Sequence, residues 1–372
     1  MKLIYSVEDK PKLSQTIVFA FQQMIAIMAA TLLVPMLMSS FPNEAGETLY
    51  FDPAAALFGA GIGSLVYILF TKKKSPVFLG SSFTFLGAYA AILGQNYGYW
   101  GVIIGILFAG LVYVVIAMII RAVGSRWVNR LMPAVIIGPI VALIGLSLSG
   151  TATSWMSTNG GDTYSLLTIA VGTATFLAIV SASVRGSKLV KLIPFVVGIA
   201  FGYIIALLFT IVGNVTGIEA LRIMDFSSLY DAFHPFTLAS IFRVPQFTFV
   251  SALKSNTLHT IDAAALSNIA ITFVPIAVVE LAQHIADHKN LSSIIGRDLI
   301  TDPGLDNTLL GDGIGSIVGG FFGGAANTTY GESIGCVAIT GNASIVTIIT
   351  AGLGCMILSF FKIGRASCRE RV

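Results

Sequence analysis

The chain has 372 residues, of which 55% are hydrophobic and 10% are charged. A soluble domain carries about 25% charged residues, so this composition excludes an ordinary soluble protein and indicates a polytopic membrane protein. The net charge of +3 identifies no partner, because the positions of the charges matter more in a membrane protein than their sum.

Stretches without Asp, Glu, Lys or Arg mark the expected membrane spans, each of which needs about 20 apolar residues. The sequence therefore predicts an all-α polytopic membrane protein. In its third and tenth spans, which are short or interrupted by glycine, we expect short extended segments. The eleven expected helices cover residues 15–38, 54–70, 77–93, 99–120, 131–149, 164–181, 190–213, 265–286, 309–324, 330–341 and 343–361.

Lysine and arginine alternate along the first seven spans. Basic residues precede the first span and follow the second, fourth and sixth, whereas the loops at 39–53, 94–98 and 150–163 have none. Since cytoplasmic loops are enriched in Lys and Arg, we expect a multi-pass protein of the cytoplasmic membrane with its N-terminus in the cytoplasm.

A ten-residue motif occurs twice. "LFGAGIGSLV" at 57–66 matches "LLGDGIGSIV" at 309–318 with seven identical positions and a constant offset of 252. Seven spans separate the copies, and because seven is odd the second copy enters the membrane upside down. Inverted repeats of this kind are typical of secondary transporters, although glycine-rich helices can also resemble each other by chance.

The two interrupted spans are "SPVFLGSSFTFLG" at 75–87 and "AANTTYGESIGCVAITG" at 325–341. Each has an extended lead-in, a glycine and then a helical run. The start of a helix leaves backbone N–H groups unpaired, so two such starts that meet would form a polar site in an apolar setting. The alternative is that Gly80 and Gly331 only allow close helix packing.

The segment "VVELAQHIADH" places Glu280 and His284 on one helical face, inside an apolar run. A buried ionisable residue in a membrane is by default a candidate functional residue, and a carboxyl group that gains and loses a proton suits a proton carrier. A structural Glu–His pair is the alternative. We expect Asp287 and His288 to be solvated at the cytoplasmic edge, and we expect no metal, although the spacing of the acid and the histidines permits one.

Four motifs, "LGSSFTF", "VVELAQH", "RDLITDPGL" and "NTTYGESIGCVAIT", resemble the nucleobase–cation symporter family, also called nucleobase–ascorbate transporters. The resemblance is closest to its bacterial uracil permeases and extends to about residue 361. In the family's signature Glu332, Gly335, Thr340 and Gly341 match, whereas Ser333 replaces the usual Asn. Gly341 also stands where uracil permeases often have Arg, so xanthine or another oxo-purine stays open as the substrate.

The resemblance implies a fold of fourteen spans, seven plus seven inverted, with a core domain and a gate domain. The resemblance also implies that the carboxylates of Glu280 and Glu332 accept hydrogen bonds from N–H groups of the base. Phe83 and Tyr330 would flank the ring of the base. Backbone N–H groups near Phe83 and Gly331 would meet the carbonyl oxygens of the base. Two supporting residues complete the implied site: His284, which would steady the coupling carboxyl group, and Ala30, which would leave room for the base.

Further expectations from the resemblance are proton coupling, elevator-like movement and a homodimer. The partners would then be a nucleobase and the lipid bilayer, without nucleic acid, and the proton would be the coupling ion with no other cofactor. We expect no enzymatic activity, because no nucleophile–base set is present. An anion carrier of the sulfate or bicarbonate type and a non-transporting scaffold are the competing hypotheses.

The expected domain plan follows the spans. Its parts are a cytoplasmic segment 1–14, a core domain 15–120, a gate domain 121–213, an external linker 214–264, a second core part 265–361 and a non-native tail 362–372. The tail is basic where the charge alternation predicts an external end, which suggests a junction, although a genuine short tail is the alternative. Relative to the family, we expect the last three spans to be missing.

Overall fold

The computed structural model of the protein describes residues 3–125, 164–187, 190–191, 194–224, 242–255 and 258–361, with single residues and short groups between 127 and 157. The expected span 131–149 and the tail 362–372 lie largely outside the described residues. The chain divides into two compact units, Met1–Val141 with Val244–Phe361, and Ala142–Arg243 with Lys362–Val372. The domain bounds expected from the sequence stay a prediction.

The second unit contains α7 (Leu166–Arg185), α9 (Pro194–Thr216) and the short η1 (Glu219–Leu221). Helices α7 and α9 pack against each other and expose many large apolar side chains. Ser165 caps α7, because its side chain accepts a hydrogen bond from the backbone N–H of Thr168. This unit has few buried polar groups among its described residues, so it offers less chemistry than the first.

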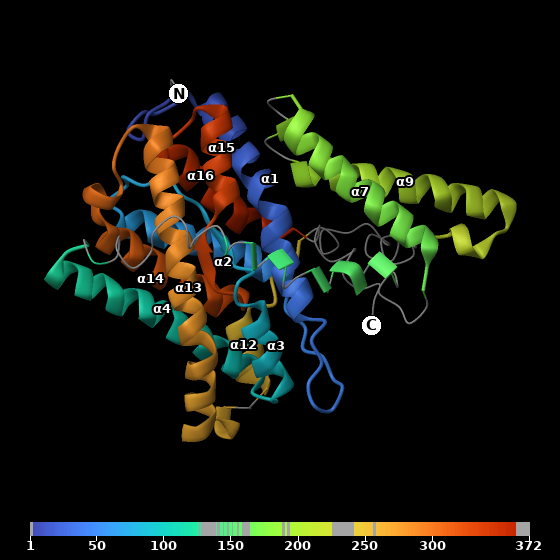
Figure 1. Ribbon diagram of the computed structural model, residues 1–372, viewed down its shortest axis with the longest axis horizontal. Coiled ribbons are helices and arrows are strands. Elements are labelled where there is room, and N and C mark those ends of the chain that lie inside the picture. Colours follow the sequence, from blue (N-terminus) through green and yellow to red (C-terminus); the bar gives the residue numbers. More distant parts are fainter. Residues whose placement is uncertain are drawn as a thin grey trace. The chain divides into compact units, whose positions relative to one another are not determined.

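The first unit contains most of the helices and the only sheet among the described residues. Figure 1 shows its elements, which are α1 (Leu13–Met38), α2 (Pro53–Phe70), β1 (Leu79–Ser81), α3 (Leu86–Gly94), α4 (Gly98–Val123), α12 (Thr248–Ser255), η2 (Leu258–Thr260), α13 (Ala263–Ile295), η3 (Ile300–Gly304), α14 (Leu305–Gly323), β2 (Asn327–Thr329), α15 (Gly331–Thr340) and α16 (Ile345–Leu358). Helix α12 lies within the expected external linker and packs on α4 and α14.

Six helices among the described residues are long and apolar enough to cross a membrane. They match the expected spans within a few residues, except that the last continues well past residue 286. The six are Leu13–Met38, Pro53–Phe70, Gly98–Val123, Leu166–Arg185, Val196–Thr216 and Ala263–Ile295. A mostly helical, membrane-spanning fold is therefore confirmed.

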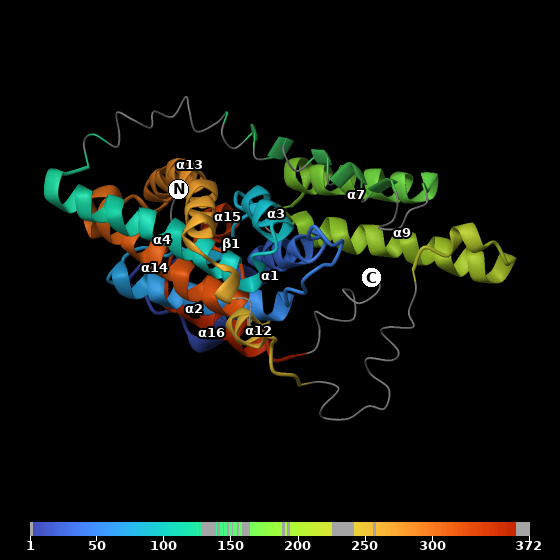
Figure 2. The same cartoon turned by 90° about the horizontal axis from the view of Figure 1, so that it is seen from below.

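The two copies of the glycine motif form α2 and α14, which lie side by side (Figure 2). Their backbones are in direct contact, since a Cβ atom added to Gly59 would lie 2.3 Å from the carbonyl oxygen of Gly319. The contact at the centre is reciprocal: a Cβ on Gly63 or on Gly315 would lie 2.8 Å from the carbonyl oxygen of the other. Glycine is required here because any side chain would separate the helices.

The strands β1 and β2 pair antiparallel, with Gly80 opposite Thr328 at the centre. Each strand is held by the serine of the motif copy that precedes it. Leu79 donates its N–H to Ser64 Oγ at 2.8 Å, and Ser316 Oγ donates to the carbonyl of Asn327. Ser64 acts as the acceptor and Ser316 as the donor, and the inverted repeat stays a prediction.

Near the N-terminus, residues 4–9 run along the loop between α15 and α16. Ala343 donates its N–H to the carbonyl of Tyr5 at 2.9 Å, and Ile345 donates to Val7 at 3.1 Å. Glu8 also pairs with Arg297 at 2.5 Å. The start of the chain is thereby fixed to residues more than 330 positions later.

An ionic cluster joins the loops around this segment. Asp302, just before α14, pairs with Lys74 at 2.5 Å and with Arg297 at 2.6 Å. The hydrogen bonds from Lys74 and Arg297 lower the pKa of the Asp302 carboxyl group. The hydrogen bonds that Arg297 donates to Asp302 and to Glu8 raise the pKa of its guanidinium group. The loop that leads to β1 is thus tied to the loop that leads to α14.

Candidate functional site

The strand pair brings the two predicted interrupted spans together. Beyond the ladder, Ser82 donates its N–H to the carbonyl of Ala326 at 2.9 Å, and Tyr330 donates to Phe78 at 3.2 Å. Helix α3 begins at Leu86, soon after β1, and α15 begins at Gly331, soon after β2. The interruptions lie where the sequence predicts them, and the two segments are in direct contact.

Neither of these helix starts has a side-chain cap. Phe85 precedes α3 and Tyr330 precedes α15, and neither makes a capping hydrogen bond with its side chain. The first N–H groups of a helix have no partner within the helix and carry partial positive charge. At the start of α3, Leu86 donates its N–H to the carbonyl of Phe83 at 3.1 Å and Thr84 donates to Ser82 Oγ at 3.3 Å, so part of its donors is used locally. The two helix starts lie on either side of one strand pair.

Glu280 points toward this place from α13. Its side chain is buried, with 2% of the residue exposed, and Ser82 Oγ lies 3.4 Å from Oε1. Thr84 and Thr328 lie beside the same carboxyl group. Within the described part of the chain, Oε2 is buried without a hydrogen-bond partner, so one oxygen remains able to accept a hydrogen bond.

The other predicted site residues differ in exposure. Ala30, Phe83 and Glu332 are partly exposed and Gly331 is exposed, so these four are accessible. Tyr330 is buried and its hydroxyl donates to the carbonyl of Ser81 at 3.1 Å. Its ring covers Gly80, where an added Cβ would lie 1.7 Å from ring carbon Cε2.

The partners of His284 differ from the expected one. Its Nδ1 lies 2.6 Å from Asp312 Oδ2, and its Nε2 lies 3.1 Å from Thr308 Oγ1. Thr329 on β2 donates its hydroxyl to the same oxygen of Asp312 at 2.9 Å. Both ring nitrogens are thus directed at α14 rather than at Glu280, and the expectation that His284 steadies Glu280 directly is wrong.

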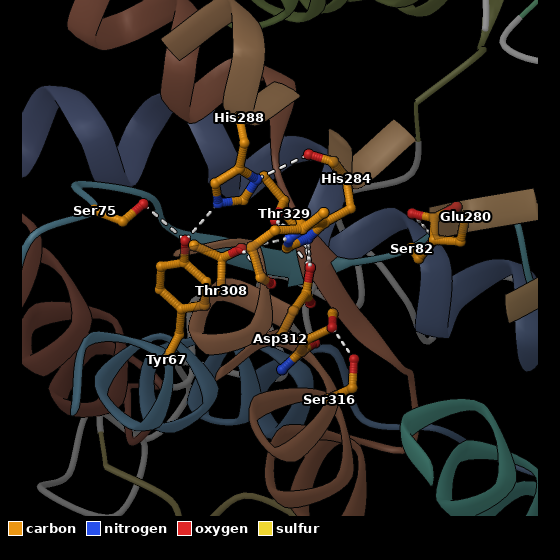
Figure 3. A network of polar contacts seen from close by, with 12 residues as sticks. Tyr67, Ser75, Ser82, Glu280, His284, His288, Thr308, Asp312, Ser316 and Thr329 are labelled. Atoms are coloured by element: carbon orange, nitrogen blue, oxygen red, sulfur yellow. Dashed lines mark hydrogen bonds and ion pairs between the residues drawn. The ribbon is translucent and has the colours of Figure 1, made fainter. Parts of the chain in front are cut away.

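The expected solvation of His288 is also wrong. This residue is fully buried, and its Nε2 lies 2.6 Å from the hydroxyl of Tyr67, which in turn lies 2.7 Å from Ser75 Oγ (Figure 3). The rings of His284 and His288 stack with their centroids 4.1 Å apart. The polar face of α13 therefore continues one turn further into the protein than the hydropathy pattern suggests.

Sequence reasoning missed Asp312, the acid at the centre of this network. A signal was present in the repeat, because the second motif copy has this acid where the first has Ala60. An acid in a glycine-rich apolar helix is costly to bury unless it is paired. The mismatch between otherwise similar copies could have identified it.

The sequence pattern of a permease family matches residues 14–366. The chain belongs to this family. The predicted resemblance is therefore confirmed, and the permease is a multi-pass protein of the cell membrane that acts in transport.

Curated relatives of the permease include the uracil permease of Bacillus caldolyticus, with 35% identity over 98% of this chain and 75% of the relative. The uracil permease of Bacillus subtilis (strain 168) is 32% identical over 98% of this chain and 76% of the relative. The uracil permease of Escherichia coli (strain K12) is 30% identical over 94% of this chain and 73% of the relative.

Among solved structures, the permease resembles the transmembrane domain of a cyanobacterium bicarbonate transporter, BicA. The TM-score is 0.59 with 14% identity, over 96% of this chain and 85% of that chain. This likeness concerns the fold alone. The fold is thus that of a transporter membrane domain.

Proposed function

We propose that the permease takes up a nucleobase, uracil in the first place, together with protons across the cytoplasmic membrane. The observation that supports this proposal is the β1–β2 pair, which joins the two interrupted segments, together with the buried carboxyl group of Glu280, which lies 3.4 Å from Ser82 Oγ just after β1. The relatives named uracil permease support the choice of substrate.

The chemistry of the site suits a flat, uncharged ring with an imide edge. Such an edge alternates carbonyl, N–H and carbonyl groups, so it needs donors on both sides of an acceptor. The helix starts near Phe83 and Gly331 supply backbone donors, and Glu280 and Glu332 supply acceptors. Phe83 and Tyr330 would flank the ring, and Ala30 would leave space for it.

Glu280 and His284 are the proposed proton-coupling residues. Binding and release of a proton change the charge of a buried carboxyl group, whose burial in the charged form is costly. In an elevator-like movement, the first unit would carry the bound substrate and the bound proton across the membrane together. An N-terminus in the cytoplasm and a homodimer belong to the same proposal.

Oxo-purines are the second candidate substrates, because Ser333 and Gly341 depart from the usual family signature. An anion of the sulfate or bicarbonate type is the third, because helix starts bind anions. The two acids Glu280 and Glu332 oppose an anion, since like charges repel.

A competition panel tests the substrate. Purified protein in proteoliposomes is offered labelled uracil against unlabelled uracil, xanthine, hypoxanthine, urate and sulfate. We expect uracil to compete most strongly, and stronger competition by sulfate would overturn the proposal. Glu332→Ala should weaken uracil binding by about 1.5–3 kcal/mol, the range for a hydrogen bond to a charged group.

Coupling is tested with Glu280→Gln and the matched control Glu47→Gln, which changes an exposed acid. We expect the first variant to lose proton-driven accumulation and the control to retain it. Undiminished accumulation by Glu280→Gln at both acidic and neutral pH would remove this acid from the coupling step.

A further inference from the structure

The buried side chains of Ser75, Tyr67 and His288 have no role in the proposed binding or coupling. All three are fully buried and belong to different parts of the first unit: the segment before β1, α2 and α13. Ser75 Oγ lies 2.7 Å from the Tyr67 hydroxyl, which lies 2.6 Å from His288 Nε2. Polar groups so deeply buried need a reason beyond packing.

The directions of these hydrogen bonds follow from the partners. His288 Nδ1 lies 2.8 Å from the backbone carbonyl of His284, and a carbonyl can only accept. Nδ1 therefore carries the hydrogen, and in the neutral ring Nε2 accepts. Tyr67 donates its single hydroxyl proton to Nε2, so Ser75 must donate to the Tyr67 oxygen. Each of the three donors, the Ser75 hydroxyl, the Tyr67 hydroxyl and His288 Nδ1–H, thus donates one hydrogen bond.

This chain of contacts ends on His284. Beyond the bond to its carbonyl, the His288 ring stacks on the His284 ring, with centroids 4.1 Å apart and planes at 29°. On its other sides, the His284 ring makes an edge contact with the Tyr113 ring, and its two nitrogens bond Asp312 and Thr308. The ring is thus held by His288 on one side and by α4 and α14 on the others.

We propose that Tyr67 and His288 are positioning residues for His284, which hold its imidazole ring in line with Asp312. The proposal rests on the proposed proton coupling. Ser75 fixes the Tyr67 hydroxyl, Tyr67 fixes the His288 ring, and that ring fixes His284 at 2.6 Å from the acid. Helix α2, whose motif copy contains no acid, thereby supports Asp312 in the motif copy of α14.

Other titratable groups also face this place and set its background charge. They are Asp312 on α14, Tyr113 on α4, Tyr67 on α2, Glu332 on α15, and Glu280, Asp287 and His288 on α13. The proposed variants remove only the hydroxyl of Tyr67 or of Ser75, which is neutral between pH 5 and 8, and leave the other groups in place. A change in pH dependence would therefore report the position of His284 and not a lost charge.

Tyr67→Phe removes one oxygen and keeps the ring, and Tyr99→Phe is the matched control, because the Tyr99 hydroxyl donates to the carbonyl of Tyr50 instead. Uracil binding and proton-driven uptake are measured in proteoliposomes between pH 5 and 8. We expect Tyr67→Phe to keep its uracil affinity within about twofold and to move the pH profile of uptake toward acid by about one unit, a tenfold change in proton affinity. The control should keep the wild-type profile.

Ser75→Ala is the milder second variant, which keeps the test decisive if Tyr67→Phe does not fold. It should move the pH profile in the same direction by a smaller amount. An unchanged profile in the folded variants would overturn the proposal, and so would a loss of uracil affinity that accompanies every shift. Wild-type uptake without proton movement would refute the proposed function instead, so the two failures are distinguishable.

Discussion

The two copies of the glycine motif share their architecture and differ in their chemistry. Ser64 and Ser316 each hold the strand that follows, and glycines of both copies meet backbone to backbone. At one position, however, the first copy has Ala60, which is fully buried, and the second has Asp312, which pairs with His284. A repeated scaffold thus positions two similar strands, while a single substitution gives only one side a buried acid.

The difference indicates how two helices with similar glycine motifs can give a one-sided site. The central contact between Gly63 and Gly315 depends on a glycine that is the same in both copies. The acid depends on partners that the first copy does not have. Changes at shared positions should therefore affect stability, and changes at the differing position should affect stability and transport together.

The largest effect is expected for Asp312→Ala, which makes the second copy resemble the first. The change leaves His284 and the hydroxyl of Thr329 without their buried partner. We expect a loss of about 3 kcal/mol or more in the free energy of unfolding, measured by denaturant titration in mixed micelles, together with a loss of uptake. Parental stability in this variant would show that the acid is not paired as described.

Gly59→Ala tests the backbone contact between α2 and α14. The new methyl group would lie 2.3 Å from the carbonyl oxygen of Gly319, so α2 and α14 must separate. We expect a cost of about 1–3 kcal/mol in the same titration, as for other overpacked interiors. The control is Gly87→Ala in α3, where no heavy atom of the described residues lies within 4 Å of the added Cβ, and which should cost nothing.

Ser64→Ala and Ser316→Ala test whether the two strands are held equally. Each change removes a buried hydroxyl that bonds a strand backbone, and such a hydrogen bond is worth about 1 kcal/mol. Ser64→Ala also removes the bond from this hydroxyl to the carbonyl of Ala60 at 2.7 Å, within α2. We expect similar losses in the free energy of unfolding. A large effect of one change beside no effect of the other would mean that the two copies do not carry equivalent contacts.

The smallest effect is expected at the ionic cluster, where the loop after the first copy meets the loop before the second. The pKa of Asp302 lies below its usual 3.8, mainly because Lys74 donates a hydrogen bond to the carboxylate. The stabilisation by this group is therefore complete above about pH 4 and is lost as the pH falls through the lowered pKa of the folded state. Asp302→Asn should lower the thermal midpoint slightly at pH 7, and this difference should shrink as the pH falls below about 4. A midpoint difference that does not shrink with falling pH would contradict this assignment.

Much of the fold could be predicted from the sequence, because a membrane forces long apolar runs to become helices. The strand pair could also be located, since glycine and Thr-rich stretches interrupt two of these runs at 79–81 and 327–329. Helix α13 extends to Ile295, beyond the expected end, because one face of its last turns is buried at His288 and Leu291. Gly296 then ends the helix in a left-handed conformation with φ 69°.

The pairing within the site could not be predicted in the same way. Asp312 lies 28 positions after His284, on another helix, and Tyr67 lies 221 positions before His288. Spacing along one helix indicates which side chains share a face, and it carries no information on what that face meets. The burial of His288 could not be predicted because its hydrogen-bond partner, Tyr67, counts only as an apolar residue in a hydropathy pattern.

The docking of residues 4–9 onto the loop at 341–345 has a consequence for biosynthesis. Both the N-terminal segment and β1 find their partners only after about 250 or more further residues have left the ribosome. At about 5–20 residues per second, this interval lasts roughly 10–70 s. During that time β1 has no strand partner, and unpaired strand edges make nascent or partly folded chains prone to aggregation.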